Sequence, residues 1–383
     1  MARSVHRRGV RDLNPLRYQL APSKHLLVPV RIHGTNSSSH LDPKSSQSSA
    51  IPWIVLELGR NYSREPDLDS LQKMPSFDPD WLNQCEVNLD RVQETCSNIL
   101  RRRCVKGVNQ AAWQLRAVTC LDLTSLNSDD TPSTIFRLCS KAVKPLSDEI
   151  VSQLQTVGVR TAAVCVYPPR VKDCVDSFET LGVRLPIAAV ASGFPSGQYS
   201  IGSRLDEIRF AVESGADEID VVINRTAAHR NDWETVFNEL CEMKEACGSA
   251  HMKVILSTGE LGSLKNVRKA SLTAMQAGAD FIKTSTGKES VNANYPVTLT
   301  MLRAISDYYR DTQTRVGFKP AGGIRTAKDA LDYQLLVNEV LGKDWLKNDL
   351  FRIGASGLLS DIERQLFFYA TKRYANASDL APC

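Results

Sequence analysis

The chain has 383 residues, of which 42% are hydrophobic and 23% are charged, a composition typical of globular proteins. No apolar run approaches the roughly 20 residues that a membrane-spanning helix needs, so no membrane partner is predicted. The formal net charge is +4, but residues 1–50 hold eight Lys/Arg and two acidic residues, which leaves 39 basic against 41 acidic residues in the remainder. Because most of the chain is not basic, nucleic acid is not expected as a partner.

The cysteine pattern argues against a disulfide-stabilised protein, and the histidine pattern argues against a zinc protein. Ten cysteines are scattered without a C-x-x-C pair, which in a chain of this length indicates reduced thiols in a cytosol-like compartment. The first 40 residues hold four of the six histidines, so only His229 and His251 remain for a zinc site. We therefore expect a cytoplasmic protein with no metal and no cofactor.

Residues 1–76 are predicted to be a disordered extension that is dispensable for activity. They lack sustained hydrophobic periodicity and are rich in Ser, Arg and Pro, with patches such as NSSSH and KSSQSSA. Such a composition buries too little apolar surface to fold. The Arg and Ser enrichment also suits a mitochondrial transit peptide, although Pro15 interrupts its first amphipathic stretch. A mitochondrial location is therefore the alternative to the cytoplasm.

A helical lead-in is predicted over residues 77–116. Asp78 can cap its first helix, and Pro79 suits the first helical position. The positions that then recur at helical spacing and should face the core are Cys85, Leu89, Val92, Cys96 and Ile99.

From residue 117 to residue 379, short apolar strands alternate with amphipathic helices, and residues 380–383 form a tail. The predicted strands are 117–123, 161–167, 186–192, 218–224, 253–257, 280–284, 316–320 and 350–356. Eight strand–helix repeats favour a parallel sheet closed as a (β/α)₈ TIM barrel. An open doubly wound sheet is the alternative, but no G-x-G-x-x-G follows the first strand.

Side-chain alternation along these strands predicts which residues face the barrel interior. In the segment EIDVVIN, Ile219, Val221 and Ile223 should face the helices, which turns Asp220 inward. By the same alternation Lys283 and Lys319 point inward from adjacent strands, which lie about 4.8 Å apart. Cys165 also faces inward, and Asp122 shares its face with Val118 and Cys120. Active sites of such barrels lie at the C-terminal ends of the strands.

Two inward lysines and a carboxylate predict covalent catalysis through a Schiff base. A free lysine amine, with a pKa of about 10.4, is protonated at pH 7. Burial and a neighbouring ammonium group both lower that pKa, so Lys319 can make Lys283 a nucleophile toward a carbonyl group. Asp220 can then move a proton on and off the adjacent carbon. One such residue alone is more often a solvated strand end, but three clustered charges are costly inside a barrel without a function.

The loops after the last three predicted strands favour a phosphorylated substrate. Glycines let backbone N–H groups approach an anion closely, and barrels often hold phosphate after strands seven and eight. Thr284 is a supporting residue, and the predicted phosphate-binding residues are Thr286, Gly287, Lys288, Gly322, Gly323, Gly354 and Ser356. The segment TSTGK also resembles the end of a nucleotide-binding P-loop. Ile282 and Glu289, however, stand where that motif requires Gly and Ser/Thr, so we reject nucleotide binding.

At these residues the sequence resembles the eukaryotic deoxyribose-phosphate aldolases. The resemblance covers about residues 77–379 and is carried by LDLTSLNSDDT, CVYP, EIDVVIN, STGEL, DFIKTSTGK, GFKPAGGIRT and FRIGAS. It implies that Lys283 forms the Schiff base, that Lys319 tunes it and relays protons, and that Asp220 donates and accepts a proton. The implied reaction is the reversible cleavage of 2-deoxy-D-ribose 5-phosphate to acetaldehyde and D-glyceraldehyde 3-phosphate, in deoxyribonucleoside catabolism.

Two departures from the family pattern bear on the site. Gly357 follows GAS where a hydroxyl residue is expected, and the last tyrosine is Tyr374, so we assign no role to the C-terminal tail. A transaldolase or another phosphosugar aldolase would share the lysine and the phosphate loops. A catalytically silent phosphosugar-binding or scaffold protein is the alternative from another class, although such a protein has no need of two clustered amines. A homo-oligomer is compatible with the sequence.

Overall fold

The computed structural model describes residues 76–102 and 105–381. The extension predicted over residues 1–76 therefore lies, except for Ser76, outside the described residues, as do the last two residues of the predicted tail. The division of the remaining chain into a lead-in over 77–116 and a barrel over 117–379 stays a prediction.

Eight parallel strands form the centre of the protein. They are β1 (Leu121–Thr124), β2 (Ala163–Val166), β3 (Ile187–Ala191), β4 (Glu218–Val222), β5 (His251–Ile255), β6 (Phe281–Lys283), β7 (Gly317–Lys319) and β8 (Ile353–Ala355). Each strand from β1 to β7 pairs in parallel with the next, and β1 also pairs with β8. Two parallel bridges, Phe318 to Phe351 and Ala321 to Gly354, join β7 to the β8 segment. The predicted TIM barrel is confirmed, and the open sheet is excluded.

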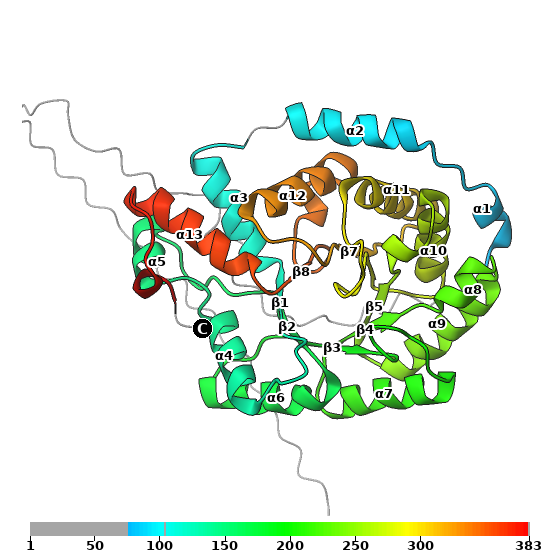
Figure 1. The fold of residues 1–383 in the computed structure, drawn as a ribbon, viewed down its shortest axis with the longest axis horizontal. Coiled ribbons are helices and arrows are strands. Elements are labelled where there is room, and N and C mark those ends of the chain that lie inside the picture. The colour runs from blue at the N-terminus through cyan, green and yellow to red at the C-terminus, as the bar shows by residue number, and fades with distance from the viewer. Residues whose placement is uncertain (1–75, 103–104, 382–383) are drawn as a thin grey trace, which may run out of the picture. The chain divides into compact units, whose positions relative to one another are not determined.

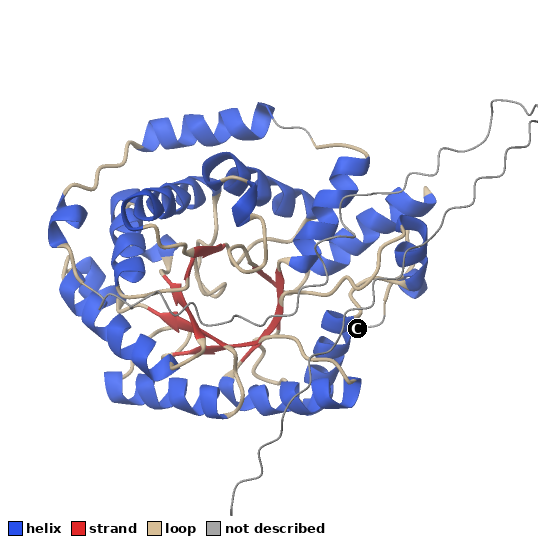
Figure 2. Cartoon of the chain, turned by 180° about the vertical axis from the view of Figure 1, so that it is seen from behind, coloured by secondary structure: helices blue, strands red, loops and turns tan. Residues whose placement is uncertain are grey.

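Helices surround this ring of strands (Figure 2). The long helices that follow the strands are α4 (Pro132–Val143), α6 (Val171–Leu181), α7 (Ile201–Glu213), α9 (Trp233–Cys247), α10 (Leu264–Gln276), α11 (Tyr295–Thr312), α12 (Ala327–Leu341) and α13 (Leu358–Thr371). Shorter helices are α5 (Asp148–Leu154), α8 (Arg225–His229) and the 3₁₀ turns η1 (Pro168–Arg170), η2 (Thr258–Glu260), η3 (Lys343–Trp345) and η4 (Ala377–Asp379). In Figure 1 the labelled helices lie around the labelled strands.

The lead-in contains three helices, α1 (Pro79–Asn83), α2 (Leu89–Arg102) and α3 (Val108–Thr119). The Asp78 side chain accepts a hydrogen bond from the backbone N–H of Trp81, so the predicted cap is confirmed. The helix does not run on through Cys85 as its spacing suggested. Asn88 caps a new helix by accepting from the N–H of Arg91, and Leu89 is 51% exposed. The buried face of α2 therefore begins only at Val92.

The strand predictions are correct in number and order, and their boundaries lie within four residues of the observed ones. The largest error is at β1, where residues 117–119 end helix α3. Val118 and Cys120 consequently belong to the hydrophobic cluster outside the strands and do not share the inward face of Asp122. The reason is that a short apolar run, such as AVTC, has the same appearance at the end of a buried helix and at the start of a strand.

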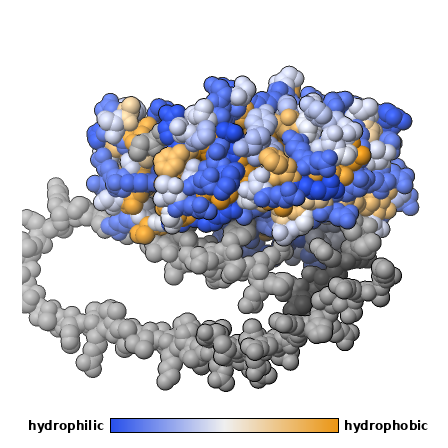
Figure 3. Space-filling model, turned by 90° about the horizontal axis from the view of Figure 1, so that it is seen from below, coloured by the Kyte–Doolittle hydropathy of each residue, from blue (hydrophilic) through white to orange (hydrophobic). Residues whose placement is uncertain are grey.

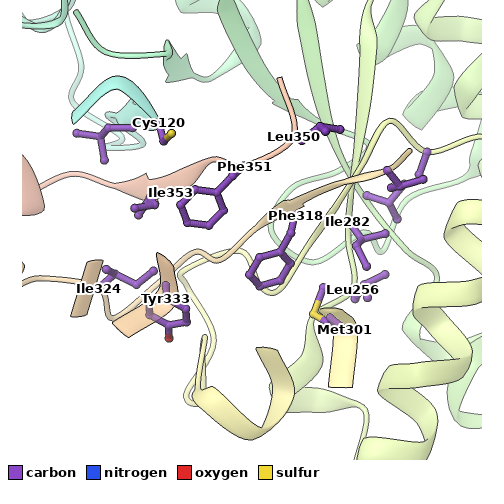
Figure 4. Packing of buried hydrophobic residues seen from close by; sticks show 14 of the residues in the cluster. Cys120, Leu256, Ile282, Met301, Phe318, Ile324, Tyr333, Leu350, Phe351 and Ile353 are labelled. Carbon is purple, nitrogen blue, oxygen red and sulfur yellow. The ribbon is translucent and has the colours of Figure 1, made fainter. Parts of the chain in front are cut away.

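The main hydrophobic core lies between the barrel and the helices. The apolar residues predicted to face outward include Ile219, Val221, Ile282 and Phe318, and these four belong to this buried cluster. Figure 4 shows Phe318, Phe351 and Ile353 gathered with side chains of the surrounding helices. Because the apolar side of each strand is fixed in this way, its alternate residues must fill the barrel interior.

The outer surface carries a mixture of residue types. Over the face seen in Figure 3, hydrophilic and apolar residues are interspersed. Within residues 76–102 and 105–381, no helix is both long enough and apolar enough to cross a membrane. The eight cysteines of that part of the chain are free thiols.

The first prediction tests the packing of the barrel interior. A Cβ atom added at Gly317 would lie 2.3 Å from Cε1 of Phe281. Gly317→Ala should therefore lower the free energy of unfolding by about 1–3 kcal/mol, the usual cost of overpacking a core. The matched control is Gly202→Ala in α7, where an added Cβ meets nothing within 4 Å. Urea midpoints should fall for the first variant only, and equal midpoints would contradict this account of the interior.

Candidate active site

Seven ionisable side chains meet inside the barrel, and we call them the buried charge cluster. Each is at most 3% exposed. The cluster comprises Asp122 from β1, Glu218 and Asp220 from β4, Lys253 from β5, Lys283 from β6, Lys319 from β7 and Arg352, which directly precedes β8. The four charged residues that alternation placed inward, namely Asp122, Asp220, Lys283 and Lys319, therefore do share one site.

Asp220 lies at the centre of this cluster. Its Oδ2 accepts hydrogen bonds from Nζ of Lys283 at 2.8 Å and from Nζ of Lys319 at 2.7 Å. Its Oδ1 accepts from Nζ of Lys253 at 3.1 Å. The two lysines are side by side because the parallel register of β6 and β7 pairs Lys283 directly with Lys319. One carboxylate thus brings three amines together.

Lys319 is held between two carboxylates. Its Nζ lies 2.6 Å from Oδ2 of Asp122 and 2.7 Å from Oδ2 of Asp220. Burial lowers the pKa of Lys319, but these two carboxylates outweigh it and raise the pKa above its ordinary value. Gly354 leaves room for this arrangement, since a Cβ there would lie 3.2 Å from Cε of Lys319. Lys319 is therefore an ammonium at neutral pH.

The pKa of Lys283 is lowered, whereas that of Lys319 is raised. Burial lowers its pKa most, the Lys319 charge lowers it further, and Asp220 opposes both, so that the pKa stays below the ordinary lysine value. Burial also raises the pKa of Asp220, but Lys253, Lys283 and Lys319 outweigh it and hold that pKa far below the normal range. The site therefore presents a carboxylate and an amine that loses its proton readily.

Sequence reasoning missed three members of the cluster, Glu218, Lys253 and Arg352. Nη2 of Arg352 donates to Oε1 of Glu218 at 2.8 Å, and Nζ of Lys253 donates to Oε2 of the same residue at 2.6 Å. Alternation could have found all three, because the outer hydrophobic cluster contains Ile219 next to Glu218, and both neighbours of Lys253 and of Arg352.

Of the three predicted supporting residues, Asp122 contacts Lys319, and Cys165 and Thr284 also lie close to the lysines. Cys165 is buried beside Ala188 and Val190, and burial raises the pKa of its thiol, so it is a neutral thiol and a poor nucleophile. The Thr284 hydroxyl accepts from the N–H of Ala321 at 3.0 Å. Thr284 therefore joins the end of β6 to the loop after β7.

The three predicted phosphate loops are adjacent in space. A Cβ on Gly287 would lie 3.7 Å from Cα of Gly322, and a parallel bridge joins Ala321 to Gly354. Gly287, Gly322 and Gly323 have φ angles of 82°, 83° and 80°, which side chains other than glycine disfavour. Ser356 is exposed just before α13, whose N-terminus has no side-chain cap. These loops can offer backbone N–H groups to an anion.

Some predicted phosphate ligands already have partners within the protein. Oε1 of Glu289 accepts from the N–H and the hydroxyl of Thr286, at 2.9 and 3.0 Å. The N–H of Gly354 donates to the carbonyl of Pro320 at 2.9 Å. Nζ of Lys288 donates to the carbonyl of Leu126 at 3.1 Å, across the mouth of the barrel. Thr286 and Gly354 therefore organise the loops, whereas exposed Lys288 can exchange its partner for an anion.

A hollow of about 550 Å³ opens at the same mouth, and it is lined by Leu126, Asn127, Ser128, Asp129, Tyr167 and Lys288. These residues follow β1, β2 and β6, so the hollow lies at the C-terminal ends of the strands. Among the residues that the structure describes, no three His, Cys, Asp or Glu side chains are arranged to hold a metal ion.

A parallel (β/α)₈ barrel with paired lysines at its C-terminal mouth has the architecture of a lysine-dependent barrel enzyme. Residues 116–341 match the DeoC/LacD family aldolases. The chain is 55% identical over 306 residues to the deoxyribose-phosphate aldolase of Mus musculus, with 79% of this chain and 96% of that protein covered. The deoxyribose-phosphate aldolase of Homo sapiens is 54% identical over 306 residues, which again cover 79% of this chain and 96% of that protein. The chain therefore belongs to the DeoC/LacD aldolase family.

A solved structure supports the same fold. A putative deoxyribose-phosphate aldolase from Toxoplasma gondii matches with a TM-score of 0.56 and 20% identity, over 72% of this chain and 100% of that one. At this identity the likeness concerns the barrel alone.

The second prediction concerns acid stability. The pKa values of Asp122, Glu218 and Asp220 are held below normal, because the cluster's cations outweigh the effect of burial. A carboxylate with a lowered folded pKa stabilises the fold above its unfolded pKa, and this stability is lost as pH falls toward the folded pKa. Between about pH 4.5 and pH 3 the free energy of unfolding should therefore fall steeply.

Glu218→Gln removes one of these titrating groups. The variant should be less stable than the wild type at pH 7 but should lose stability less steeply on acidification, by up to about 1.4 kcal/mol per pH unit. Urea unfolding at several pH values measures both slopes. Parallel slopes would mean that Glu218 is not ionised in the folded protein.

Proposed function

We propose that this chain is a deoxyribose-phosphate aldolase, a carbon–carbon lyase that reversibly cleaves 2-deoxy-D-ribose 5-phosphate to acetaldehyde and D-glyceraldehyde 3-phosphate. The relatives of 53–55% identity bear that name. The observation that carries the proposal is the cluster in which Asp220 Oδ2 accepts from Lys283 Nζ at 2.8 Å and from Lys319 Nζ at 2.7 Å.

Lys283 is proposed to be the nucleophile. Its neutral amine attacks the aldehyde carbon C1 of the open-chain sugar, and loss of water gives an iminium ion. A base then removes the proton of the C3 hydroxyl, the C2–C3 bond breaks, and its electron pair forms the enamine. D-Glyceraldehyde 3-phosphate leaves at this point. Protonation at C2 restores the iminium, and water releases acetaldehyde and the free amine.

Asp220 is proposed to perform the proton transfers, directly or through a water molecule. It is a carboxylate in the resting enzyme because three amines surround it, so the first transfer runs toward it. The same amines make protonated Asp220 a strong acid, which favours passing the proton on to C2 of the enamine. Lys319 keeps the neighbouring charge that suppresses protonation of Lys283, and Asp122 holds Lys319 in place.

The substrate phosphate is proposed to bind at the loops after β6, β7 and β8. The adjacency of Gly287 and Gly322, the positive φ of Gly323 and the uncapped N-terminus of α13 beside Ser356 support this location. Lys288 lies at the same rim and supplies a positive charge. A role in deoxyribonucleoside catabolism, a cytoplasmic location and a homo-oligomeric state stay predictions.

The third prediction separates the two lysines. Reduction with borohydride in the presence of acetaldehyde should add one ethyl group to Lys283 and to no other lysine. Lys283→Arg should abolish both labelling and turnover, because a guanidinium stays protonated and cannot form an imine. Lys319→Leu removes the neighbouring positive charge, so the pKa of Lys283 should rise and activity should appear only at higher pH.

Peptide mass spectrometry and the pH–rate profile are the measurements for this prediction. A label on Lys319, or an unshifted profile for Lys319→Leu, would contradict the proposed roles. Parallel assays with deoxyribose 5-phosphate and with fructose phosphates distinguish this activity from that of another phosphosugar aldolase.

The fourth prediction concerns the phosphate. Lys288→Ala should raise KM for deoxyribose 5-phosphate by about ten- to a hundredfold, since a charge-assisted contact contributes roughly 1.5–3 kcal/mol. KM for unphosphorylated deoxyribose should change far less. Lys265→Ala is the matched control, because this lysine pairs with Glu86 on the outer surface and should leave both constants unchanged. Equal effects of Lys288→Ala on both substrates would place the phosphate elsewhere.

A further inference from the structure

The buried charge cluster holds unequal numbers of acidic and basic groups. It contains three carboxylates but four bases, and all seven side chains are almost fully buried. An uncompensated charge is costly in such an environment. The cluster is electrically balanced only when one of the four bases is neutral.

The contacts decide which base is neutral. Arg352 remains charged at any ordinary pH and contacts both Asp122 and Glu218. Lys253 lies between Glu218 and Asp220. Lys319 likewise lies between two carboxylates, those of Asp122 and Asp220.

Lys283 has the weakest compensation of the four. Within residues 76–102 and 105–381, its one carboxylate contact is to Oδ2 of Asp220, the same oxygen that Lys319 contacts. Lys283 is therefore the base that is neutral in the balanced cluster, in agreement with the lowered pKa of this residue.

Arg352 and Glu218 complete the charge balance of the cluster without being part of the Lys283–Asp220 contact. Arg352 binds Glu218 through both terminal nitrogens, at 2.8 and 3.1 Å, and its Nη1 also donates to Asp122 at 2.7 Å. The contacts of Arg352 with Asp122 and Glu218, and that of Glu218 with Lys253, are not made with Lys283 itself. They act on Lys283 through the electrostatic field of their charges and through their contacts with Asp122 and Lys253.

We propose that Arg352 and Glu218 are positioning residues that set the charge state of the Lys283 amine by fixing the charge balance of the cluster. The inference rests on the proposed function only in that neutral Lys283 is the nucleophile. Other titratable groups around the cluster are Cys165, a neutral thiol facing the lysines, Cys120, a thiol near Arg352 and Asp122 whose pKa is raised by burial, and His251, whose Nδ1 lies 3.9 Å from Oε1 of Glu218.

Replacing Arg352 and replacing Glu218 should shift the pKa of Lys283 in opposite directions. Arg352→Met leaves three carboxylates and three bases, so protonated Lys283 becomes favourable and its pKa rises. Glu218→Gln leaves two carboxylates and four bases, so the pKa falls. Each shift should be about one pH unit or more, the order expected for a full charge removed within a protein interior. The double variant restores an excess of one base and should lie near the wild type.

The pKa of Lys283 can be measured without turnover. Competitive acetylation with acetic anhydride from pH 6 to pH 10, followed by peptide mass spectrometry, gives the fraction of neutral amine at this lysine. The pH dependence of kcat/KM for deoxyribose 5-phosphate gives the same pKa through catalysis, because it reports the free enzyme. The acid limb of the kcat/KM profile should move to higher pH in Arg352→Met and to lower pH in Glu218→Gln.

Arg352→Lys is the conservative control, since it keeps the charge but loses the two-nitrogen contact with Glu218. Its profile should stay close to that of the wild type, even if the rate falls. The double variant leaves no unpaired member of the Arg352–Glu218 pair, so it keeps the test available if a single variant does not fold.

Four outcomes would overturn the inference: shifts in the same direction, no shift in folded variants, a shift in Arg352→Lys as large as in Arg352→Met, or a double variant that stays shifted. Opposite shifts in acetylation without turnover of deoxyribose 5-phosphate would support the inference and refute the proposed function. Turnover with unshifted profiles would refute the inference alone.

Discussion

The need to pair every charge inside a dry barrel governs this structure. Seven ionisable side chains are buried on the inner face of the sheet, and removal from water costs each of them several kcal/mol unless it gains partners. The partners come from strands far apart in the sequence, as when Arg352 bridges Asp122 and Glu218. The register of the strands is therefore tied to the pairing of the charges, because a slip of one residue would turn these side chains toward the apolar helix layer.

The outer core and the small interior residues make this pairing available. Aliphatic side chains such as Ile219, Val221 and Ile282 pack under the helices and hold each strand with its charged face inward. Gly317 and Gly354 leave space for the Phe281 ring and for the Lys319 side chain. Because water is largely excluded, the electrostatic effect of one side chain on another is stronger than it would be at the surface. Structural packing and the tuning of the amine are thus consequences of the same burial.

The mouth of the barrel follows different rules, because it must remain open to a substrate. Its loops bend at glycines with positive φ angles, a conformation in which backbone N–H groups can face an anion. Glu289 already occupies the donors of Thr286, so one internal carboxylate stabilises the loop that we propose binds an external phosphate. Burial raises the pKa of Glu289, while the hydrogen bonds from Thr286 and Ser257 oppose this rise.

The sequence by itself determined the repeat of eight strands and the inward direction of Asp122, Cys165, Asp220, Lys283 and Lys319, because the alternation of side chains along a strand is a local property. It did not determine that residues 117–119 end a helix, since short apolar runs do not distinguish the two structures. Only the tertiary structure decided which charges meet, that Glu218, Lys253 and Arg352 join them, and that Glu289 takes the donors of Thr286. Those contacts depend on strand register and barrel closure, which join residues up to 230 positions apart and leave no local signal in the chain.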